Sequence, residues 1–294
     1  MKNNKNISGA EAVIKSLIKE NADLIFGYPG GAIMPVYDEL FKFQDKVHHV
    51  LTRHEQGAVH AAQGYARSSG RVGVAIATSG PGATNLVTGI ADAQIDSTPI
   101  VCITGQVSAH LLGSDAFQET DIIGISMPVT KWSYQITKAS EVPVAIAKAF
   151  YIAKSGRPGP VLIEIPAEIW DQNLNELNYT PVKKNLVRPD YSEINDITNV
   201  IINAKNPVLY AGQGIMYSDA EKELLNFAEI LNIPVMTTMP GKSSFPENHE
   251  LSLGSSAVST TKMISHFLNK SDVVFAIGTS LTRTPYGREI PEGK

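Results

Sequence analysis

Apolar residues in the first 170 positions follow two alternating spacings. Short continuous apolar stretches, typical of strands buried on both faces, predict strands at 24–26, 47–51, 72–77, 100–104 and 161–165. Helical spacing predicts helices at 33–43, 55–68, 83–93 and 144–154, after a first helix opened by the capping box Ser8-Gly9-Ala10-Glu11. Strands and helices that alternate this regularly predict a parallel sheet with helices on both faces.

The pattern changes between residues 171 and 190, where Asn, Gln, Lys and Pro predict a linker. Beyond it, strands are predicted at 208–211, 234–237 and 273–277, with a helix opened by the capping box Ser218-Asp219-Ala220-Glu221. The fold class is therefore α/β, with two doubly wound parallel-sheet domains. Because the chain stops a loop's length after the last predicted strand, we expect the second domain to be incomplete.

Composition excludes several classes of protein. The 294 residues carry a net charge of −4 and their basic residues form no long run, which disfavours nucleic acid and acidic membrane surfaces as partners. The only cysteine, Cys102, lies in an apolar stretch, so it forms no intrachain disulfide and does not resemble an activated thiol. No stretch approaches the roughly 20 apolar residues of a spanning helix, and we expect a cytoplasmic protein.

A candidate site centres on Glu55, in residues 53–57 (Arg-His-Glu-Gln-Gly). Glycine-bearing turns at 27–31 and 79–85 also follow predicted strands, so all three segments emerge at the carboxyl ends of parallel strands, where ligands bind. Glycines would let a flat heterocycle approach the backbone. The alternative is that Glu55 complements the helix dipole, as acids in first turns do.

Other readings of these motifs stay open or are weak. Residues 79–82 before a helix could cradle a phosphate, although neither turn has the Walker A or G-x-G-x-x-G spacing of nucleotide sites. His48 and His49 would point to opposite faces of a strand, and His54 and His60 are explained as solvated or packed side chains. We therefore expect no metal site on the protein itself.

Several motifs together resemble the acetolactate synthase large subunits, which are thiamine-diphosphate enzymes. The resemblance is dense from residue 8 to 166 and continues more weakly in the second domain. The motifs that carry it lie at 27–31 (Gly-Tyr-Pro-Gly-Gly), 53–57 (Arg-His-Glu-Gln-Gly), 64–70 (Gly-Tyr-Ala-Arg-Ser-Ser-Gly), 77–85 (Ala-Thr-Ser-Gly-Pro-Gly-Ala-Thr-Asn), 103–107 (Ile-Thr-Gly-Gln-Val), 115–119 (Asp-Ala-Phe-Gln-Glu), 130–132 (Thr-Lys-Trp) and 155–162 (Ser-Gly-Arg-Pro-Gly-Pro-Val-Leu).

The resemblance implies that residues 1–170 are the pyrimidine-binding domain and that 191–294 begin the central domain. It makes Glu55 the catalytic carboxyl group, which hydrogen-bonds to N1′ of the cofactor's pyrimidine and so permits the imino tautomer that activates the thiazolium. The cofactor-binding residues that it implies are Glu55, Pro29, Gly30, Gly31, Pro81 and Asn85.

The resemblance assigns Phe117, Gln118 and Lys131 to the substrate channel and Arg157 to the flavin that many members carry. Core packing is the alternative for Phe117, and a solvated surface charge is the alternative for Lys131 and Arg157.

The chain departs from the family pattern in places. Residues 257–260 and 280–284 replace its flavin motifs, Ser108-Ala109-His110 replaces a basic pair, and Ala167 replaces a common lysine. FAD and the acceptor 2-oxo acid therefore stay open. The family holds the diphosphate through Mg²⁺ on a Gly-Asp-Gly motif of a third domain, and these residues contain no such motif. We expect that C-terminal domain to be absent here, so that the chain carries half of a site formed at a homodimer interface.

The function implied is a carboligase that decarboxylates pyruvate on thiamine diphosphate and joins it to a second 2-oxo acid, in branched-chain amino-acid synthesis, with a small regulatory subunit as a further partner. The chain alone would be catalytically incomplete. Two alternatives are another thiamine-diphosphate 2-oxo acid decarboxylase or carboligase, and a non-catalytic assembly module. A generic nucleotide-binding protein has no fingerprint in its favour.

Overall fold

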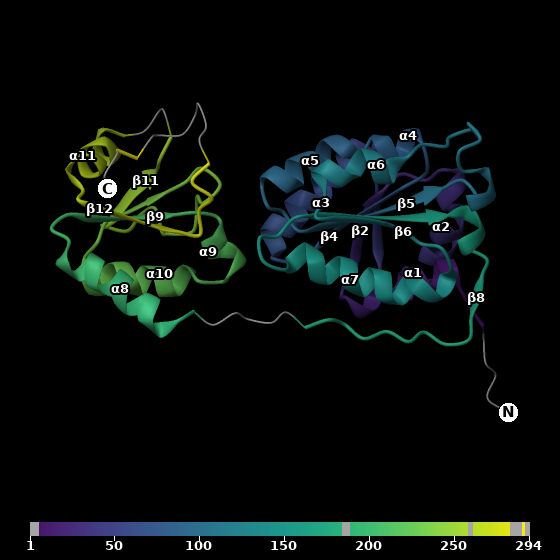
Figure 1. The fold of residues 1–294 in the computed structure, drawn as a ribbon, viewed down its shortest axis with the longest axis horizontal. Helices are drawn as coiled ribbons and strands as arrows, with labels where there is room; N and C mark the ends of the chain where they lie inside the picture. Colours follow the sequence, from purple (N-terminus) through teal and green to yellow (C-terminus); the bar gives the residue numbers. More distant parts are fainter. Residues whose placement is uncertain (1–5, 184–188, 258–260, 283–289, 292–294) are drawn as a thin grey trace. The chain divides into compact units, whose positions relative to one another are not determined.

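The computed structural model describes residues 6–183, 189–257, 261–282 and 290–291 (Figure 1). The chain divides into two compact units, Met1–Asn185 and Leu186–Lys294. Each unit contains a parallel sheet with helices on both faces, which confirms the predicted fold class. No helix in the described part of the chain is long and apolar enough to cross a membrane.

The main sheet of the first unit has six parallel strands in the order β3-β2-β4-β5-β7-β6. They are β2 (Leu24–Gly27), β3 (His48–Leu51), β4 (Gly73–Ala77), β5 (Ile100–Gln106), β6 (Trp132–Gln135) and β7 (Pro160–Pro166). Every residue of β4, β5 and β7 is buried, as continuous apolar strands in a sheet covered on both faces require.

Helices α1 (Gly9–Lys19), α2 (Met34–Lys42) and α7 (Val142–Lys154) cover one face of this sheet. The other face is covered by α3 (Glu55–Ser69), α4 (Pro81–Thr84), α5 (Val87–Ile95) and α6 (Ile122–Ser126) (Figure 1). Short 3₁₀ turns are η1 (Gly31–Ile33), η2 (Ala109–Leu111), η3 (Met127–Val129), η4 (Ala139–Glu141) and η5 (Ala167–Ile169).

Strand β5 illustrates how the core is divided between the two faces. Val101 and Ile103 pack into the cluster under α1 and α7, whereas Cys102 packs into the cluster under α3 and α5. Burial of Cys102 raises the pKa of its thiol to about 12, so the interpretation of this cysteine as an unactivated core residue is confirmed.

The second unit has four parallel strands in the order β11-β10-β9-β12. The strands are β9 (Pro207–Ala211), β10 (Val235–Thr237), β11 (Ser252–Ser255) and β12 (Val273–Ile277). Helices α8 (Tyr191–Asn203) and α10 (Glu221–Leu231) cover one face, and α11 (Lys262–Lys270) covers the other. A short helix, α9 (Gly214–Tyr217), follows β9.

The two predicted capping boxes have different outcomes. Ser8 does cap α1, because its hydroxyl accepts a hydrogen bond from the amide of Glu11 at 3.1 Å. The prediction for Ser218 is wrong: Ser218 is the C-cap of α9, and α10 starts after Ala220 without a side-chain cap. Ser218 ends the preceding helix α9 and therefore does not start α10.

Several elements were not predicted, namely β6, β11, α6, α8, α11 and the antiparallel pair β1 (Ile7–Ser8) and β8 (Asn173–Leu174). The stretch with linker composition is therefore ordered where it begins. Tyr179 in that stretch donates a hydrogen bond to Glu20 at 2.6 Å and packs on the first unit. Residues 184–188 of that stretch, and parts of the substituted flavin motifs at 258–260 and 283–284, lie outside the described residues.

Candidate functional site

The candidate site lies at a switch point in the strand order of the first unit. Strands β2 and β4 are neighbours in the sheet, with β3 on the outer side of β2 and β5 on the outer side of β4. The direction in which successive strands are added therefore reverses between β2 and β4. In parallel sheets a crevice opens outside the carboxyl ends of two such strands, and ligands bind in it. The turns at 28–31 and 79–85 and the start of α3 all follow carboxyl ends at this point.

Glu55 is the first residue of α3, and it is buried, with 7% of its surface exposed. Asn85 donates a hydrogen bond from Nδ2 to Glu55 Oε2 at 2.9 Å. Among the described residues no other group donates to this carboxylate. One oxygen is therefore engaged, and Oε1 keeps its capacity to accept a hydrogen bond from a ligand.

Asn85 lies at an interruption of the helix predicted at 83–93. The structure has α4 as far as Thr84, then Asn85 and Leu86, and then α5 from Val87. The prediction of a continuous helix is therefore wrong here, and the residue that donates to Glu55 lies at the junction of the two helices.

Two glycines bring the turns close together around Thr78. A Cβ on Gly30 would lie 2.5 Å from Thr78 Cγ2, and a Cβ on Gly82 would lie 2.6 Å from the same methyl carbon and 3.3 Å from Glu55 Oε1. The Thr78 hydroxyl also accepts a hydrogen bond from the amide of Ala32 at 3.2 Å. The turns therefore pack on one side chain, and neither glycine can carry a side chain without displacement.

Gly31 differs from these glycines, because a Cβ there would meet nothing within 4 Å. Its free face is not filled by the described residues, so space remains beside the turn. Pro29 and Gly30 are partly buried and Pro81 is exposed at the start of α4. The predicted cofactor-binding residues are thus brought to one edge of the sheet.

Tyr37 on α2 is a neighbour of Glu55 that the sequence analysis missed. Burial and the charge of Glu55 both raise the pKa of the Tyr37 phenol. Its hydroxyl lies 3.3 Å from Nε2 of His49, and a Cβ on Gly27 would come within 2.8 Å of the same oxygen. Helical spacing alone could not distinguish Tyr37 from an ordinary core residue.

Phe117 and Gln118 lie on the long loop, residues 107–120, which connects β5 to α6 and contains η2. Phe117 projects outward with 88% of its surface exposed, so core packing does not explain it. Gln118 adopts a left-handed conformation with φ 63°, and its carbonyl oxygen would lie 2.6 Å from a Cβ on Gly80. Gly80 itself has φ 57°. The absence of a side chain there lets the long loop lean on the turn that carries Asn85.

The structure does not bring Lys131 and Arg157 to Glu55. Both precede strands, so they lie at the amino-terminal edge of the sheet, whereas Glu55 lies at the carboxyl edge. Lys131 donates to the carbonyls of Ile152 and Ser155 at the end of α7, and burial lowers its pKa. Arg157 donates to the Ser97 hydroxyl at 2.6 Å and to the Ile95 carbonyl at 2.9 Å.

A second buried acid, Glu164 on β7, was also missed. Only 1% of its surface is exposed, and its two oxygens accept hydrogen bonds from Gln106 and Gln135, each at 2.6 Å. The pKa of Glu164 is raised to about 7: burial is the largest cause, the hydrogen bonds from Gln135 and Gln106 oppose it, and the charge of Asp121 adds to it. The signal in the sequence was an acid inside an otherwise apolar strand.

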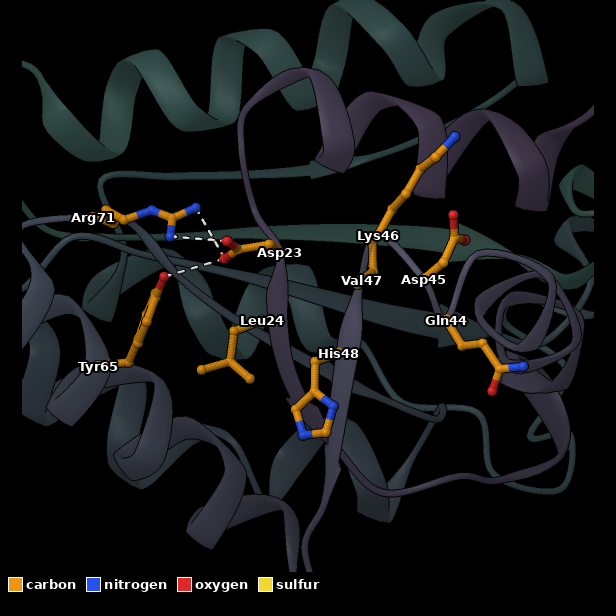
Figure 2. A pocket seen from close by; sticks show the side chains of 9 residues that line it. All are labelled: Asp23, Leu24, Gln44, Asp45, Lys46, Val47, His48, Tyr65 and Arg71. Atoms are coloured by element: carbon orange, nitrogen blue, oxygen red, sulfur yellow. Dashed lines mark hydrogen bonds and ion pairs between the residues drawn. The ribbon is translucent and has the colours of Figure 1, made fainter.

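One hollow in the described residues lies away from Glu55. It has a volume of about 430 Å³ and lies where β2 and β3 begin, at the opposite edge of the sheet (Figure 2). Figure 2 shows Tyr65 and Arg71 both directed at Asp23, with hydrogen bonds of 3.3 and 3.1 Å. No group of three His, Cys, Asp or Glu side chains converges as a metal site in the described residues.

Two protein-family models and several known proteins match this chain. The model of the thiamine pyrophosphate enzyme N-terminal TPP binding domain matches residues 7–125, and the model of the thiamine pyrophosphate enzyme central domain matches residues 194–293. The acetolactate synthase large subunit of Corynebacterium glutamicum is 50% identical over 283 residues, which are 94% of this chain and 44% of that protein.

Two relatives from other organisms have similar sequence identity to this chain and similar coverage. The probable acetolactate synthase large subunit of Methanocaldococcus jannaschii is 47% identical over 280 residues, 92% of this chain and 47% of that protein. The acetolactate synthase of Mycobacterium bovis is 46% identical over 283 residues, 94% of this chain and 45% of that protein. The chain therefore spans slightly less than half the length of these relatives.

The raised pKa of Glu164 predicts a pH-dependent stability. Because the pKa in the folded chain, about 7, lies above the ordinary 4.5, the contribution of Glu164 is full below pH 4.5 and is lost as the pH rises through 7. Relative to Glu164→Gln, which does not titrate, the wild type should lose about 2.5 kcal/mol of unfolding free energy between pH 5 and 8. Urea unfolding of both proteins across this range checks the prediction, and parallel curves would contradict it.

The packing around Thr78 predicts that Gly82→Ala destabilises the folded chain and that a second substitution, at Thr78, relieves this destabilisation. Gly82→Ala should cost about 1 to 3 kcal/mol because the new methyl group overlaps Thr78 Cγ2. Thr78→Ser deletes that methyl carbon and keeps the hydroxyl, so the double variant should recover most of the loss. Gly57→Ala, where a Cβ meets nothing within 4 Å inside α3, is the control and should not destabilise. Additive losses in a double-mutant cycle of thermal unfolding would refute the packing argument.

Proposed function

The chain belongs to the thiamine pyrophosphate enzymes, and we propose that it forms the pyrimidine-binding half of the catalytic site of an acetolactate synthase large subunit. Residues 1–170 are the pyrimidine-binding domain in this proposal, 171–190 the linker, and 191–294 part of the central domain. The observation that carries the proposal is the buried Glu55 carboxylate, with Oε2 held by Asn85 and Oε1 unengaged by the described residues.

The residues present fit an aminopyrimidine ring. A carboxylate shielded from water forms a stronger hydrogen bond to a ring nitrogen than an exposed one, since the local dielectric is low. In the proposal Glu55 accepts from, or shares a proton with, N1′ of the pyrimidine, and Asn85 fixes its orientation. The turns with Pro29, Gly30 and Gly31 and with Pro81 offer backbone for the flat ring to approach, and the open face of Gly31 leaves it room.

Thiamine diphosphate, when bound, supplies the carbon nucleophile with which pyruvate is decarboxylated and joined to a second 2-oxo acid. The contribution of this chain is to hold a proton at the pyrimidine and to keep water from the carboxylate. The diphosphate and Mg²⁺ are assigned to a further domain of a partner subunit, as the family resemblance implies. The proposed enzyme is thus at least a homodimer.

The long loop contributes the substrate side of the proposed site. Phe117 is exposed and Gln118 leans on the Gly80 turn, so both lie on a segment that touches the cofactor turns. Lys131 and Arg157 receive no role in substrate or FAD binding within this unit, because their hydrogen bonds are made at the other edge of the sheet. The proposal does not depend on bound FAD or on a small regulatory subunit. The single buried cysteine fits a reducing cytoplasm.

Another thiamine-diphosphate decarboxylase or carboligase is the second candidate. Ala167 and the segment Ser108-Ala109-His110 favour it, since they replace basic residues of the acetolactate synthase pattern. The Ala109 amide donates to Glu168 at 3.0 Å, so an acid at η5 now faces this segment. The acceptor for the second step therefore has to be identified by product analysis.

A chimera tests the proposed reaction. This chain replaces the matching residues of the Corynebacterium glutamicum large subunit, to which it is 50% identical, and the purified chimera is given pyruvate, thiamine diphosphate and Mg²⁺. We expect acetolactate as the product. Acetaldehyde without acetolactate would favour the second candidate. Neither product, from a chimera that assembles like its parent, would favour a non-catalytic assembly module.

The role of Glu55 is tested in the same chimera. Glu55→Gln removes the exchangeable carboxyl proton at constant size and should lower kcat by about 100-fold or more. Glu11→Gln is the matched control, because Glu11 also stands in the first turn of a helix and complements its dipole. That control should leave kcat unchanged. Equal activity of both variants would reduce Glu55 to a helix-dipole residue and refute its catalytic role.

A further inference from the structure

A buried polar network at the carboxyl edge of β5, β6 and β7 is not used by the proposed chemistry. It consists of Glu164 and the two amides that donate to it, Gln106 on β5 and Gln135 on β6. Glu164 and Gln106 are almost fully buried, and no Lys, Arg or His hydrogen-bonds to this acid within the described residues. An acid without a counter-charge is costly to bury.

Gln106 connects this network to both ends of the long loop. Its Nε2 donates to the carbonyl of Thr120 at 2.8 Å, where the loop ends, as well as to Glu164. Its Oε1 accepts from the amide of Val107 at 2.8 Å, where the loop begins. Oε1 therefore faces Val107 and Nε2 faces Glu164 and Thr120, so the Val107 donor and the acceptors at Glu164 and Thr120 together set the orientation of this amide.

The loop in turn touches the turn that holds the proposed catalytic acid. The backbone of Gln118, two residues before Thr120, lies against Gly80. Gly80 starts the segment whose Asn85 donates to Glu55. A continuous set of contacts therefore runs from Glu164 through Gln106 and the loop to the Glu55 carboxylate.

We propose that Glu164 is a positioning residue, which orients Gln106 and thereby holds the loop 107–120, with Phe117 and Gln118, against the Gly80 turn. The importance of this position for turnover rests on the proposed function, whereas the ordering of the loop does not. The network needs an acceptor at position 164 that faces Gln106, and it does not need a charge there.

Three variants separate these requirements. Glu164→Gln keeps a carbonyl oxygen for Gln106, and its own amide can donate to Gln135 once Gln135 turns its side-chain amide over. Glu164→Leu removes the acceptor at similar volume. Gln106→Leu removes the bonds to Thr120 and Val107. Each substitution changes the interior of the same unit, so a control for general destabilisation is required.

Gln63→Leu is the matched control. Gln63 is buried on α3, and its amide donates to the carbonyl of Gly89 at 2.9 Å, so the substitution breaks the same kind of bond as Gln106→Leu. It makes no hydrogen bond with the loop 107–120. Any effect on the loop that merely follows lost stability should therefore appear in this variant too.

Amide hydrogen exchange of the full chain, followed by mass spectrometry of peptides covering 106–123, measures the ordering of the loop. We expect Glu164→Leu and Gln106→Leu to exchange these amides about tenfold faster than the wild type, and Glu164→Gln and Gln63→Leu to stay close to it. Unchanged exchange in Glu164→Leu would overturn the proposal, and so would equal acceleration in Gln63→Leu.

The chimera provides the functional readout. Glu164→Leu should lower kcat/KM for pyruvate, and Glu164→Gln should restore it. If the unsubstituted chimera forms no acetolactate while the loop exchange follows the expected pattern, the proposed function fails and the positioning of the loop stands. If the chimera is active and Glu164→Leu leaves kcat/KM unchanged, the proposed importance of the loop position for turnover is overturned.

Discussion

The hydrogen bond from Asn85 to Glu55 is the interaction on which the candidate site depends. It joins two segments that are 30 positions apart and holds a carboxylate that is largely removed from water. A buried acid with one hydrogen-bond donor among the described residues has unused acceptor capacity, because a carboxylate can accept several hydrogen bonds. That unused capacity is the physical reason to expect a ligand with a hydrogen-bond donor at this edge of the sheet.

The glycines around Thr78 make that geometry attainable. Gly30 and Gly82 have no side chains, so two turns can pack on one threonine, and Gly80 lets the long loop approach at a backbone conformation that side chains rarely adopt. Gly31 has the opposite role, since its free face leaves space. Close approach and open space thus alternate within a few residues, which suits the flat ring of the proposed cofactor.

Much of this arrangement could be predicted from the sequence. Fully buried strands such as β4 and β7 are continuous apolar stretches, and the alternation of strands and helices places the turns at one edge. Weakly patterned elements could not be predicted: β6 is a half-buried edge strand, and its Trp132 stacks with Tyr134 of the same strand and lies under Lys148 of α7, a contact that the residues of β6 themselves do not signal. The positions of Lys131 and Arg157 depend on side-chain direction and strand end, which motif resemblance does not encode.

Glu55 and Glu164 show how the same residue type can serve two purposes in one sheet. Both are buried toward the carboxyl edge of the sheet, yet both oxygens of Glu164 accept from amides of neighbouring strands, whereas one oxygen of Glu55 has no donor among the described residues. An acid whose two oxygens each accept from protein groups is suited to holding those groups in place. An acid with an oxygen that no described residue engages can accept a hydrogen bond from a ligand. The number of internal partners therefore distinguishes the proposed positioning role of Glu164 from the proposed catalytic role of Glu55.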